Sequence, residues 1–462
     1  MQAFLDFLMV IKSFMWDYLL IFLLCGVGLY FTIRLRFVQF RKLGESFKAT
    51  FGGITLFGKK ATKEGMTSFQ SLVTAIAAQI GTGNLAGVAG AMVLGGPGSV
   101  FWMWVSALLG MATIYAEATL AQKYKTTNEN GEVIGGPVYY IRAAFHDSKF
   151  GKVLAAIFSV LLILALGFMG NIVQANSAAA AMEVAFGISP AVTGILIGFL
   201  ALCVFWGGVQ RIVAVAEKIV PIMALFFVGA SVIVIAVNYQ NIIPAFRDIF
   251  VGAFKPNAIM GGVLGVTIKE AVRYGIARGL FTHEAGMGST PHAHAVAKVR
   301  HPAKQGMVAM MGVFIDTIVL LPFTVLVILT TNSLTGDKSI TGIELTQKAY
   351  SAVFGQGGAI IIAICTLFFA FATIMGWYFF GLANVKYLFK SKRATSLYAI
   401  LVSVFIALGC GIKVPLVWDL SDLFNGFLVL PNLAALLILS GVVVKLMKEY
   451  EESERIAPPK RK

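Results

Sequence analysis

The feature that most constrains this sequence is an apolar stretch, Ser68–Gly96, that is long enough to cross a bilayer yet is interrupted at its centre. The interruption is formed by Gly81, Thr82, Gly83 and Asn84. Glycine is the poorest helix former after proline, so a helix is expected to unwind here. Unwound backbone at bilayer depth must find its hydrogen-bond partners in protein, water or a bound solute, because hydrocarbon offers none. The alternative interpretation is a small-residue surface where two membrane helices pack closely.

Composition places the chain among polytopic membrane proteins. Of its 462 residues, 58% are hydrophobic and only 13% are charged. The net charge of +15 does not indicate nucleic-acid binding, because the basic residues lie in short loops between apolar runs and form no continuous basic face. The cysteines lie far apart inside apolar runs and are interpreted as small core residues: Cys25, Cys203, Cys365 and Cys410.

Hydropathy predicts eleven membrane spans and therefore an all-α polytopic fold. The first span, about Trp16–Leu35, is an entry helix without a signal-peptide cleavage pattern. Core helices one to ten are expected at about 68–96, 99–122, 153–180, 191–206, 213–237, 261–299, 305–330, 359–388, 395–411 and 420–447. The predicted organisation is an extra transmembrane helix (1–35), a cytoplasmic basic loop (36–67), a first five-helix repeat (68–237), an outside segment (238–260), a second repeat (261–447) and a cytoplasmic tail (448–462).

The distribution of lysine and arginine predicts the orientation. This order of spans places most of the 37 basic residues on one side of the membrane, which the positive-inside rule assigns to the cytoplasm. A missed or extra crossing would scatter these charges over both sides. We therefore expect the N-terminus outside and the C-terminus inside.

Core helix six contains a second interruption. Gly275 and Gly279 precede it, Gly286 and Gly288 lie within it, and Pro291 suits the first turn of a new helix. Core helices one and six run in opposite directions and are five crossings apart, so the ten core helices form two halves of opposite topology. Interrupted helices at matching places in two such halves indicate the central site of an inverted-repeat transporter. The second interruption therefore favours a transport site over a packing surface.

Two motifs resemble the alanine or glycine:cation symporter family: GTGNLAGVAGA in core helix one and GIARGLFTHEAGMGSTPHAHAVAKVRHPAKQG in core helix six. The resemblance covers essentially the whole chain. It implies a sodium-coupled symporter of alanine and glycine in the plasma or inner membrane of a bacterium or archaeon, with sodium as coupling ion and no other cofactor. It also implies the five-plus-five inverted repeat shared with the neurotransmitter:sodium symporters, to which Gly81–Asn84, Phe281, Thr282, Ala370 and Thr373 are more distantly similar. We expect a monomer.

The interrupted core helix one suits a zwitterionic amino acid. The half that begins near Asn84 offers free N–H groups and partial positive charge to a carboxylate, and the half that ends near Ile80 offers carbonyl oxygens to an ammonium group. The residues expected to bind the substrate are Gln79, Gly81, Thr82, Gly83, Phe168, Phe281, Glu284, Thr373 and Trp377. Met287 is a further candidate for the pocket wall, although packing in the core or against lipid is as good an interpretation for any of these large side chains.

The resemblance also implies sodium sites made of oxygen ligands, which a hard cation prefers. The first would comprise Asn84, Thr282, the carbonyl of Gln79 and Asp316. The second would comprise Ala77, Ile80, Ala370 and Thr373. In the second site the chain departs from the relatives, because the last hydroxyl ligand falls on Ile374, which has no hydroxyl group.

Two carboxylates in the spans have alternative interpretations. Asp316 is an intramembrane charge and therefore a candidate for ion binding, but it could instead pair with a neighbouring helix or carry a proton. Glu284 lies in the second interruption, where it could carry a proton or cap the free N–H groups of the unwound segment. The histidines of core helix six lack metal-ligand spacing and are interpreted as loop or helix-cap residues: His283, His292, His294 and His301.

Other classes of membrane protein fit the sequence less well. A channel would need a continuous polar path, and it usually consists of symmetric subunits. A membrane-embedded enzyme would need paired catalytic groups, and neither a Ser/His/Asp set nor a His-Glu-x-x-His motif occurs in the spans. The nearest alternative is a proton-coupled amino-acid symporter.

Overall fold

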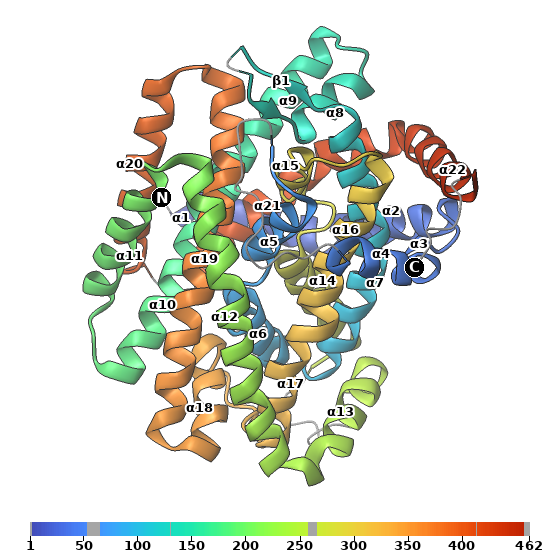
Figure 1. Ribbon diagram of the computed structural model, residues 1–462. Coiled ribbons are helices and arrows are strands. Elements are labelled where there is room, and N and C mark those ends of the chain that lie inside the picture. The colour runs from blue at the N-terminus through green and yellow to red at the C-terminus, as the bar shows by residue number, and fades with distance from the viewer. Residues whose placement is uncertain (1, 53–64, 130, 257–265, 413, 457–462) are drawn as a thin grey trace.

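The computed structural model describes residues 2–52, 65–129, 131–256, 266–412 and 414–456. Nearly all elements in these ranges are helices, and the one sheet among them is an antiparallel pair, β1 (Thr126–Thr127) with β2 (Val133–Ile134). Figure 1 shows β1, α8 (Pro137–Ala144) and α9 (Lys149–Leu162) at one end of the molecule. Helices α13 (Ile242–Phe254) and α18 (Gly342–Phe354) lie at the opposite end. The predicted all-helical class is confirmed.

The entry segment is helical from its first described residue. It comprises α1 (Gln2–Phe14), the π-helical η1 (Met15–Leu19), α2 (Leu20–Arg34), α3 (Val38–Arg41) and α4 (Leu43–Phe51). The run Leu8–Arg34 is long and apolar enough to cross a membrane. The loop predicted at 36–67 is thus partly helical, and its residues 53–64 lie outside the described part of the chain.

The predicted first repeat begins with the bent helix, which consists of α5 (Ser68–Gln79), η2 (Thr82–Asn84) and α6 (Ala86–Gly95). It continues with α7 (Gly98–Lys123), the β1–β2 hairpin, α8, α9, η3 (Ile163–Gly170), α10 (Asn171–Phe186), α11 (Pro190–Phe205) and α12 (Gly208–Val237). Helices α9, η3 and α10 form one continuous apolar rod, Lys149–Phe186, that corresponds to core helix three.

The predicted second repeat follows η4 (Tyr239–Asn241) and α13. Its elements are α14 (Ile268–His283), α15 (Pro291–Ala295), α16 (Pro302–Val313), η7 (Phe314–Leu320), α17 (Leu321–Thr330), α18, α19 (Gln356–Phe389), α20 (Lys392–Gly409), α21 (Val414–Ile438) and α22 (Ser440–Ile456). Helices α16, η7 and α17 form the continuous span Pro302–Thr330, which corresponds to core helix seven.

The two interrupted helices begin with the same device. Thr67 caps α5 by accepting a hydrogen bond from the backbone of Gln70, whose side chain accepts one from the Thr67 backbone. Thr267 and Glu270 form the same reciprocal pair at the start of α14. A capping box satisfies two of the four free N–H groups at a helix start, so both helices have defined first turns.

Most of the predicted spans meet a membrane-crossing criterion. Eight described helices are long and apolar enough, or nine if the bent pair Ser68–Gln79 and Thr82–Gly95 is one span. Core helix four corresponds to α11, a shorter apolar helix, and core helix six to α14 with α15. Residues 261–265 of predicted core helix six lie outside the described part. The number of eleven crossings therefore stays a prediction.

The predicted inverted repeat would relate core helix two to seven, three to eight, and four to nine. The corresponding pairs pack against each other in the structure: α7 against α16, α10 against α19, and α11 against α20. The core lies among these pairs, and both interrupted helices contact α7.

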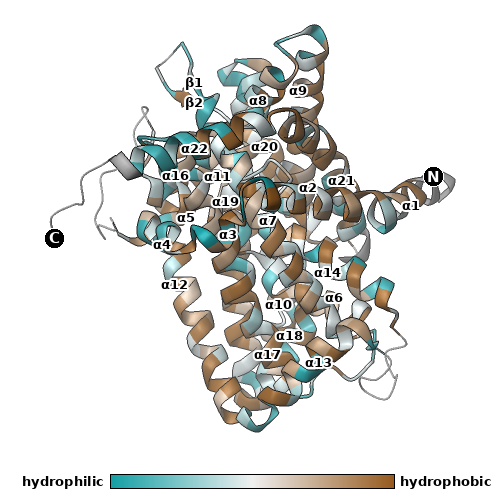
Figure 2. Ribbon diagram, turned by 90° about the vertical axis from the view of Figure 1, so that its right-hand side faces the viewer, coloured by the Kyte–Doolittle hydropathy of each residue, from teal (hydrophilic) through white to brown (hydrophobic). Residues whose placement is uncertain are grey.

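Apolar side chains also cover the outside of the helices. Figure 2 shows hydrophobic colour along the middle of the helical rods, with more hydrophilic colour near α8 and the hairpin. On α12, Ile222 is 64% exposed and Leu225 is 75% exposed. Exposure of such side chains along a helix is typical of a surface that faces lipid.

Candidate functional site

The first break lies where the glycines predicted it. Helix α5 ends at Gln79, α6 begins at Ala86, and the two segments differ in direction by 53°. Between them, Ile80 and Gly81 leave the helical conformation, with ψ of 85° and −156°. A Cβ at Gly81 would lie 2.5 Å from Thr373 Oγ1, so only glycine fits this approach of α5 to α19.

Side chains from other helices form hydrogen bonds with some of the backbone groups at the first break. Gln174 of α10 accepts a hydrogen bond from the Thr82 N–H with its Oε1 at 2.9 Å. Thr324 of α17 donates to the Asn84 carbonyl at 2.7 Å, and Thr346 of α18 donates to the Leu85 carbonyl at 2.9 Å. None of these three partners was singled out in the sequence; an uncharged polar side chain in an apolar run, as at Gln174, was the available signal.

The residues predicted for the first sodium site converge. Asn84 Nδ2 donates to Asp316 Oδ1 at 2.7 Å, and Thr317 Oγ1 donates to Asp316 Oδ2 at 2.7 Å. A Cβ at Gly83 would lie 2.7 Å from Thr282 Oγ1, which brings Thr282 to the same place. Asp316 is fully buried and lies in the π-helical turn η7, where an irregular helix aims the carboxylate at the break.

Several buried oxygens beside the first break have no hydrogen-bond partner among the described residues. They are Asn84 Oδ1, Thr82 Oγ1 and the side-chain oxygen of Gln79. The Gln79 amide nitrogen, by contrast, donates to the His283 carbonyl at 2.8 Å. Unpaired buried oxygens cost free energy unless a ligand satisfies them. Together with Asp316, they form an oxygen-rich set that fits a hard cation.

Three of the residues predicted for the second sodium site are in contact: Ala77, Ile80 and Thr373. Thr373 Oγ1 donates to the Ala77 carbonyl at 3.0 Å and is 3.4 Å from the Ile80 carbonyl. Ala370 lies one helical turn before Thr373 on α19, and Ile374 is fully buried. The Thr373 hydroxyl thus donates to a backbone carbonyl of α5, and the Ile374 side chain has no oxygen that could bind a cation.

The second break is a loop of glycines between α14 and α15. Helix α14 ends at His283, Glu284 adopts the left-handed conformation (φ 56°), and Gly286 (φ 91°) and Gly288 (φ 75°) continue in positive φ. Positive φ at these two positions favours glycine. Pro291 opens α15 at its first turn, as predicted.

Glu117, not Glu284, caps the free N–H groups of this loop. The Glu117 side chain on α7 accepts hydrogen bonds from Gly286 N–H at 3.0 Å and Gly288 N–H at 2.9 Å. Asn432 of α21 donates to Glu117 at 2.6 Å and to the Gly286 carbonyl at 2.9 Å. The capping role considered for Glu284 is therefore wrong, because the loop turns its N–H groups toward α7.

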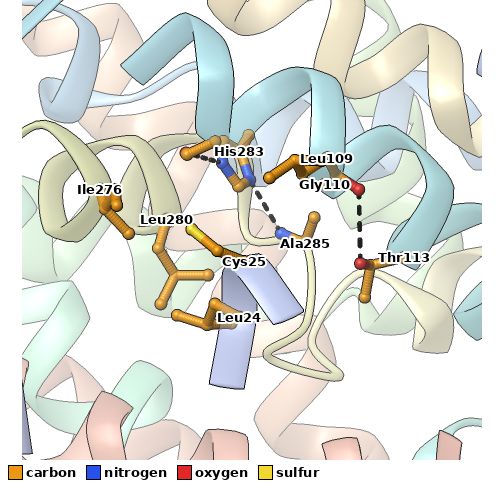
Figure 3. A pocket seen from close by; sticks show the side chains of 10 residues that line it. Leu24, Cys25, Leu109, Gly110, Thr113, Ile276, Leu280, His283 and Ala285 are labelled. Atoms are coloured by element: carbon orange, nitrogen blue, oxygen red, sulfur yellow. Dashed lines mark hydrogen bonds between the residues drawn. The ribbon is translucent and has the colours of Figure 1, made fainter. Parts of the chain in front are cut away.

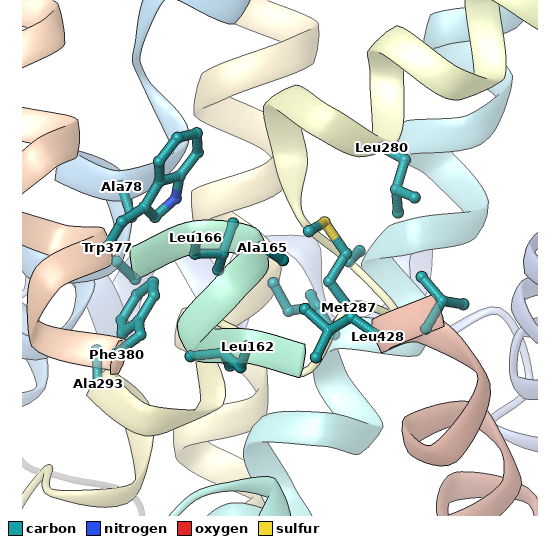
Figure 4. Close-up of a cluster of buried hydrophobic side chains, with 14 of the residues drawn as sticks. Ala78, Leu162, Ala165, Leu166, Leu280, Met287, Ala293, Trp377, Phe380 and Leu428 are labelled. Carbon is teal, nitrogen blue, oxygen red and sulfur yellow. The ribbon is translucent and has the colours of Figure 1, made fainter. Parts of the chain in front are cut away.

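Glu284 faces α19 instead. Its carboxylate accepts a hydrogen bond from Trp377 Nε1 at 2.6 Å and another from the Ser289 hydroxyl. The Phe281 ring lies edge-on to Trp377 with centroids 5.6 Å apart, and Trp418 of α21 lies 4.7 Å from Phe281. Figure 4 shows Trp377 beside Ala78 of α5 within the buried cluster that also contains Met287.

The structure does not bring Phe168 close to Phe281 and Trp377. Its ring packs against Phe405 and Tyr398 of α20, with centroids 4.9 and 5.9 Å away. Gly170, two residues later on the same span, takes the place beside Trp377: a Cβ there would lie 2.6 Å from the indole ring. The π-helical turn η3 shifts the register of this span, which the sequence pattern did not reveal.

Comparison with known proteins agrees with the geometry. A family model described as the sodium:alanine symporter family matches residues 1–461. The chain belongs to this family. It is 41% identical over 452 residues to the sodium/alanine symporter AgcS of Methanococcus maripaludis, covering 97% of this chain and 98% of that protein. It is 37% identical over 459 residues to the amino-acid carrier protein AlsT of Bacillus subtilis, covering 98% and 94%.

Among solved structures, this symporter is similar to MhsT crystallised with L-phenylalanine. The TM-score is 0.57 at 13% identity, and the match covers 86% of this chain and 100% of MhsT. At this identity the match shows the fold alone, which is the scaffold of the neurotransmitter:sodium symporters. Membership of the sodium:alanine symporter family makes the protein a multi-pass membrane transporter and not an enzyme.

The symporter closes over its site at one end through core helices six and ten. Arg278 of α14 makes two hydrogen bonds with Asp422 of α21, at 2.9 and 2.7 Å. The Arg278 guanidinium also lies 4.5 Å from the centre of the Trp418 ring. This paired contact covers Phe281, which lies one helical turn nearer the break.

The entry segment is attached to the same two helices. Lys12 pairs with Asp419 of α21 at 2.5 Å, and Asp17 pairs with Arg273 of α14 at 2.6 Å. Trp16 Nε1 donates to a backbone carbonyl of α21 at 2.9 Å. Further along, α2 packs near the second break, where a cavity of about 20 Å³ is lined by residues of α2, α7 and α14 (Figure 3).

The other end of the symporter closes where α5 begins. Ser71 donates to the Ala293 carbonyl of α15 at 2.9 Å. Met66 forms a parallel bridge with Ala297, with backbone hydrogen bonds of 3.1 Å to the Val296 carbonyl and 2.9 Å from the Lys298 N–H. The site is therefore covered at both ends in this structure.

The histidines of core helix six are held by hydrogen bonds. His283 contacts Ser106 at 2.9 Å and accepts a hydrogen bond from the N–H of Ala285, just after its own helix. His292 contacts Asn384 at 2.9 Å, and His294 contacts Gln305 at 2.8 Å. His301 caps α16, as expected for a helix-cap residue.

Proposed function

We propose that this transporter couples the entry of sodium to the uptake of a small neutral amino acid, alanine or glycine, by alternating access. The observation that supports the proposal most is the first break, where Asp316, Asn84 and unpaired buried oxygens lie beside unwound backbone. Family membership supports the coupling ion and the substrate class, since the relative AgcS is described as a sodium/alanine symporter.

The chemistry assigned to each group follows from its position. Sodium would be held by Asp316, Asn84 and Thr282, with the substrate carboxylate close enough to share the ion's charge and to meet the partial positive charge at the start of η2 and α6. The carbonyls at the end of α5 would accept from the substrate ammonium group. Binding of either ligand then favours the other, because their opposite charges lie side by side.

Side chains at the second break restrict the size of the substrate. Phe281 and Trp377 are buried, and Glu284 fixes the Trp377 indole through its Nε1. A fixed ring cannot swing aside for a branched side chain. We therefore propose that glycine and alanine bind and that leucine is excluded by steric overlap; for apolar walls each methylene is worth roughly 1–3 kcal/mol.

Sodium is favoured over a proton as the coupling ion. Both Asp316 oxygens accept hydrogen bonds, and both oxygens of Glu284 do so as well. Such bonds offset part of the cost of burying a negative carboxylate, as a ligand of a metal cation requires, and membership of the sodium:alanine symporter family supports sodium as the ion.

The experiment is uptake of labelled alanine into proteoliposomes. An inward sodium gradient should drive accumulation at equal inside and outside pH, and excess glycine should inhibit it more than excess leucine. Empty liposomes and a gradient of potassium are the controls. Accumulation driven by a pH gradient without sodium would replace this proposal with proton coupling.

We propose further that residues 68–237 and 261–447 form the two inverted repeats of a monomer, with the N-terminus outside and the C-terminus in the cytoplasm. In a background without accessible cysteines, Asp337→Cys should react with an impermeant reagent added to intact cells. Lys392→Cys should react only after lysis. The reverse pattern would invert the topology.

A further inference from the structure

A cavity of about 200 Å³ lies away from the breaks, between the α11–α12 turn and the start of α20. Its wall includes Phe205 at the end of α11, Trp206 in the turn, Tyr378 and Lys386 of α19, and Thr395 and Ser396 of α20. These segments belong to the end of the molecule where α20 begins, near α9 and the hairpin (Figure 1). None of these residues belongs to the transport site described above.

One part of the cavity wall is aromatic and apolar. The Phe205 and Tyr378 rings stack with centroids 3.5 Å apart, and Tyr378 stacks in turn on Tyr398 at 5.1 Å. Leu382 and Ala399 complete this apolar lining. A preformed hydrophobic surface of this kind favours an alkyl chain over a charged solute.

The rim of the cavity is basic. The Lys386 ammonium lies at the rim, where it pairs with Glu132 at 3.3 Å and stays partly exposed. The stem of Arg211 lies over Gly207 in the α11–α12 turn. Lys392 and Arg393 open α20, both are exposed, and no carboxylate of the described residues forms an ion pair with either.

We propose that this cavity binds an anionic phospholipid, with the first part of one acyl chain against Tyr378 and Leu382 and the phosphate near Lys386 and Arg211. Basic side chains close to a membrane surface attract anionic lipid by about 1 kcal/mol each. Trp206 is 66% exposed at the mouth of the cavity, and an exposed tryptophan at this position is typical of the membrane interface. The cavity suits part of a lipid rather than a whole one, because it is smaller than the roughly 300 Å³ of ordinary ligand pockets.

The test is native mass spectrometry of the detergent-purified full chain titrated with phosphatidylglycerol or with phosphatidylcholine of the same acyl chains. The parent should bind phosphatidylglycerol at least tenfold more tightly. The double variant Lys386→Gln, Arg211→Gln should lose about thirtyfold in affinity for phosphatidylglycerol and change little toward phosphatidylcholine. Ala399→Leu, which narrows the cavity, should weaken the binding of both lipids.

The matched control is Lys149→Gln, which removes an exposed charge at the start of α9 and should leave lipid binding unchanged. Thermal midpoints without added lipid show whether each variant is folded. Equal binding of the two lipids by the parent would overturn the proposal, as would an equal loss in the control variant. Competition by glycerol 3-phosphate at the same concentrations as the lipid would instead make this a site for a free phosphate.

Discussion

The two breaks are alike in sequence and differ in how their polar groups are satisfied. At the first, unwound N–H and carbonyl groups share a few partners, and the oxygens of Asn84, Thr82 and Gln79 have none in the described part of the chain. At the second, Glu117 binds two N–H groups of the loop and is itself held by Asn432. The first break therefore has capacity for a ligand, and the second is held by the protein.

This difference assigns separate roles to the two helices. Hydrogen bonds from Glu117 and Asn432 hold the second loop in one shape, so the second break can position Phe281 and, through Glu284, Trp377. A loop with unpaired polar atoms lowers its free energy when a solute binds. We expect changes at the second break to act on stability and changes at the first to act on transport.

The largest effect is expected at Glu117. Glu117→Ala leaves the Gly286 and Gly288 N–H groups and the Asn432 amide without their acceptor, each at a cost of about 1–3 kcal/mol. The variant should lose about 3–5 kcal/mol of stability and express poorly, as judged by its thermal midpoint and its yield. Glu117→Gln, which keeps one acceptor oxygen, should retain more of the parent's stability than the alanine variant does. An alanine variant as stable as the parent would show that the second break does not depend on α7.

The next effect is loss of transport without loss of folding. Gly83→Leu should reduce alanine uptake at least a hundredfold, because its Cβ alone would lie 2.7 Å from Thr282 Oγ1. Gly90→Ala on the same helix is the control, since a Cβ there meets its nearest atom at 3.7 Å. Undiminished uptake by a well-expressed Gly83→Leu would make the first break a packing surface.

A smaller effect concerns coupling. Sodium and alanine should each tighten the binding of the other by the same factor, because coupling between two ligands is reciprocal. Asp316→Asn removes a charge and keeps an oxygen, so this factor should fall by about tenfold, or about 1.4 kcal/mol. Calorimetric titration of alanine with and without sodium measures it. If sodium tightens alanine binding by the same factor in Asp316→Asn as in the parent, Asp316 is not part of the ion site.

The smallest effect is expected at Thr373. Thr373→Val keeps the shape and removes the hydroxyl that donates to the Ala77 carbonyl. The loss of one hydrogen bond should weaken alanine binding about fivefold, or about 1 kcal/mol, with thermal stability little changed. Thr366→Val, whose hydroxyl bonds only within its own helix, is the control. Equal losses in both variants would assign the effect to α19 as a whole.

Local sequence predicted the positions of both breaks because helix propensity is a local property. Gly81 and Gly83 interrupt one helix and Gly286 and Gly288 the other, and no distant contact is needed to see this. The convergence of Asn84 with Asp316 rested on the family resemblance, and the structure contains that contact.

The partners that hold the breaks could not be predicted in the same way. Glu117 and Gln174 lie on helices whose neighbours are set by tertiary packing, so no periodicity marks them. Phe168 was misplaced because a π-helical turn changes which residue faces the site. The role considered for Glu284 was wrong because backbone direction inside an irregular loop does not follow from residue type.

The attachment of the entry segment to α14 and α21 provides a place for a spectroscopic probe. Val10 is 67% exposed and lies two residues before Lys12, which pairs with Asp419. A spin label at Val10 moves with α21 through that pair and with α14 through the pair of Asp17 and Arg273. Its distance to a second label on α12 would therefore report the opening of this end of the transporter during turnover, without a label in the binding site.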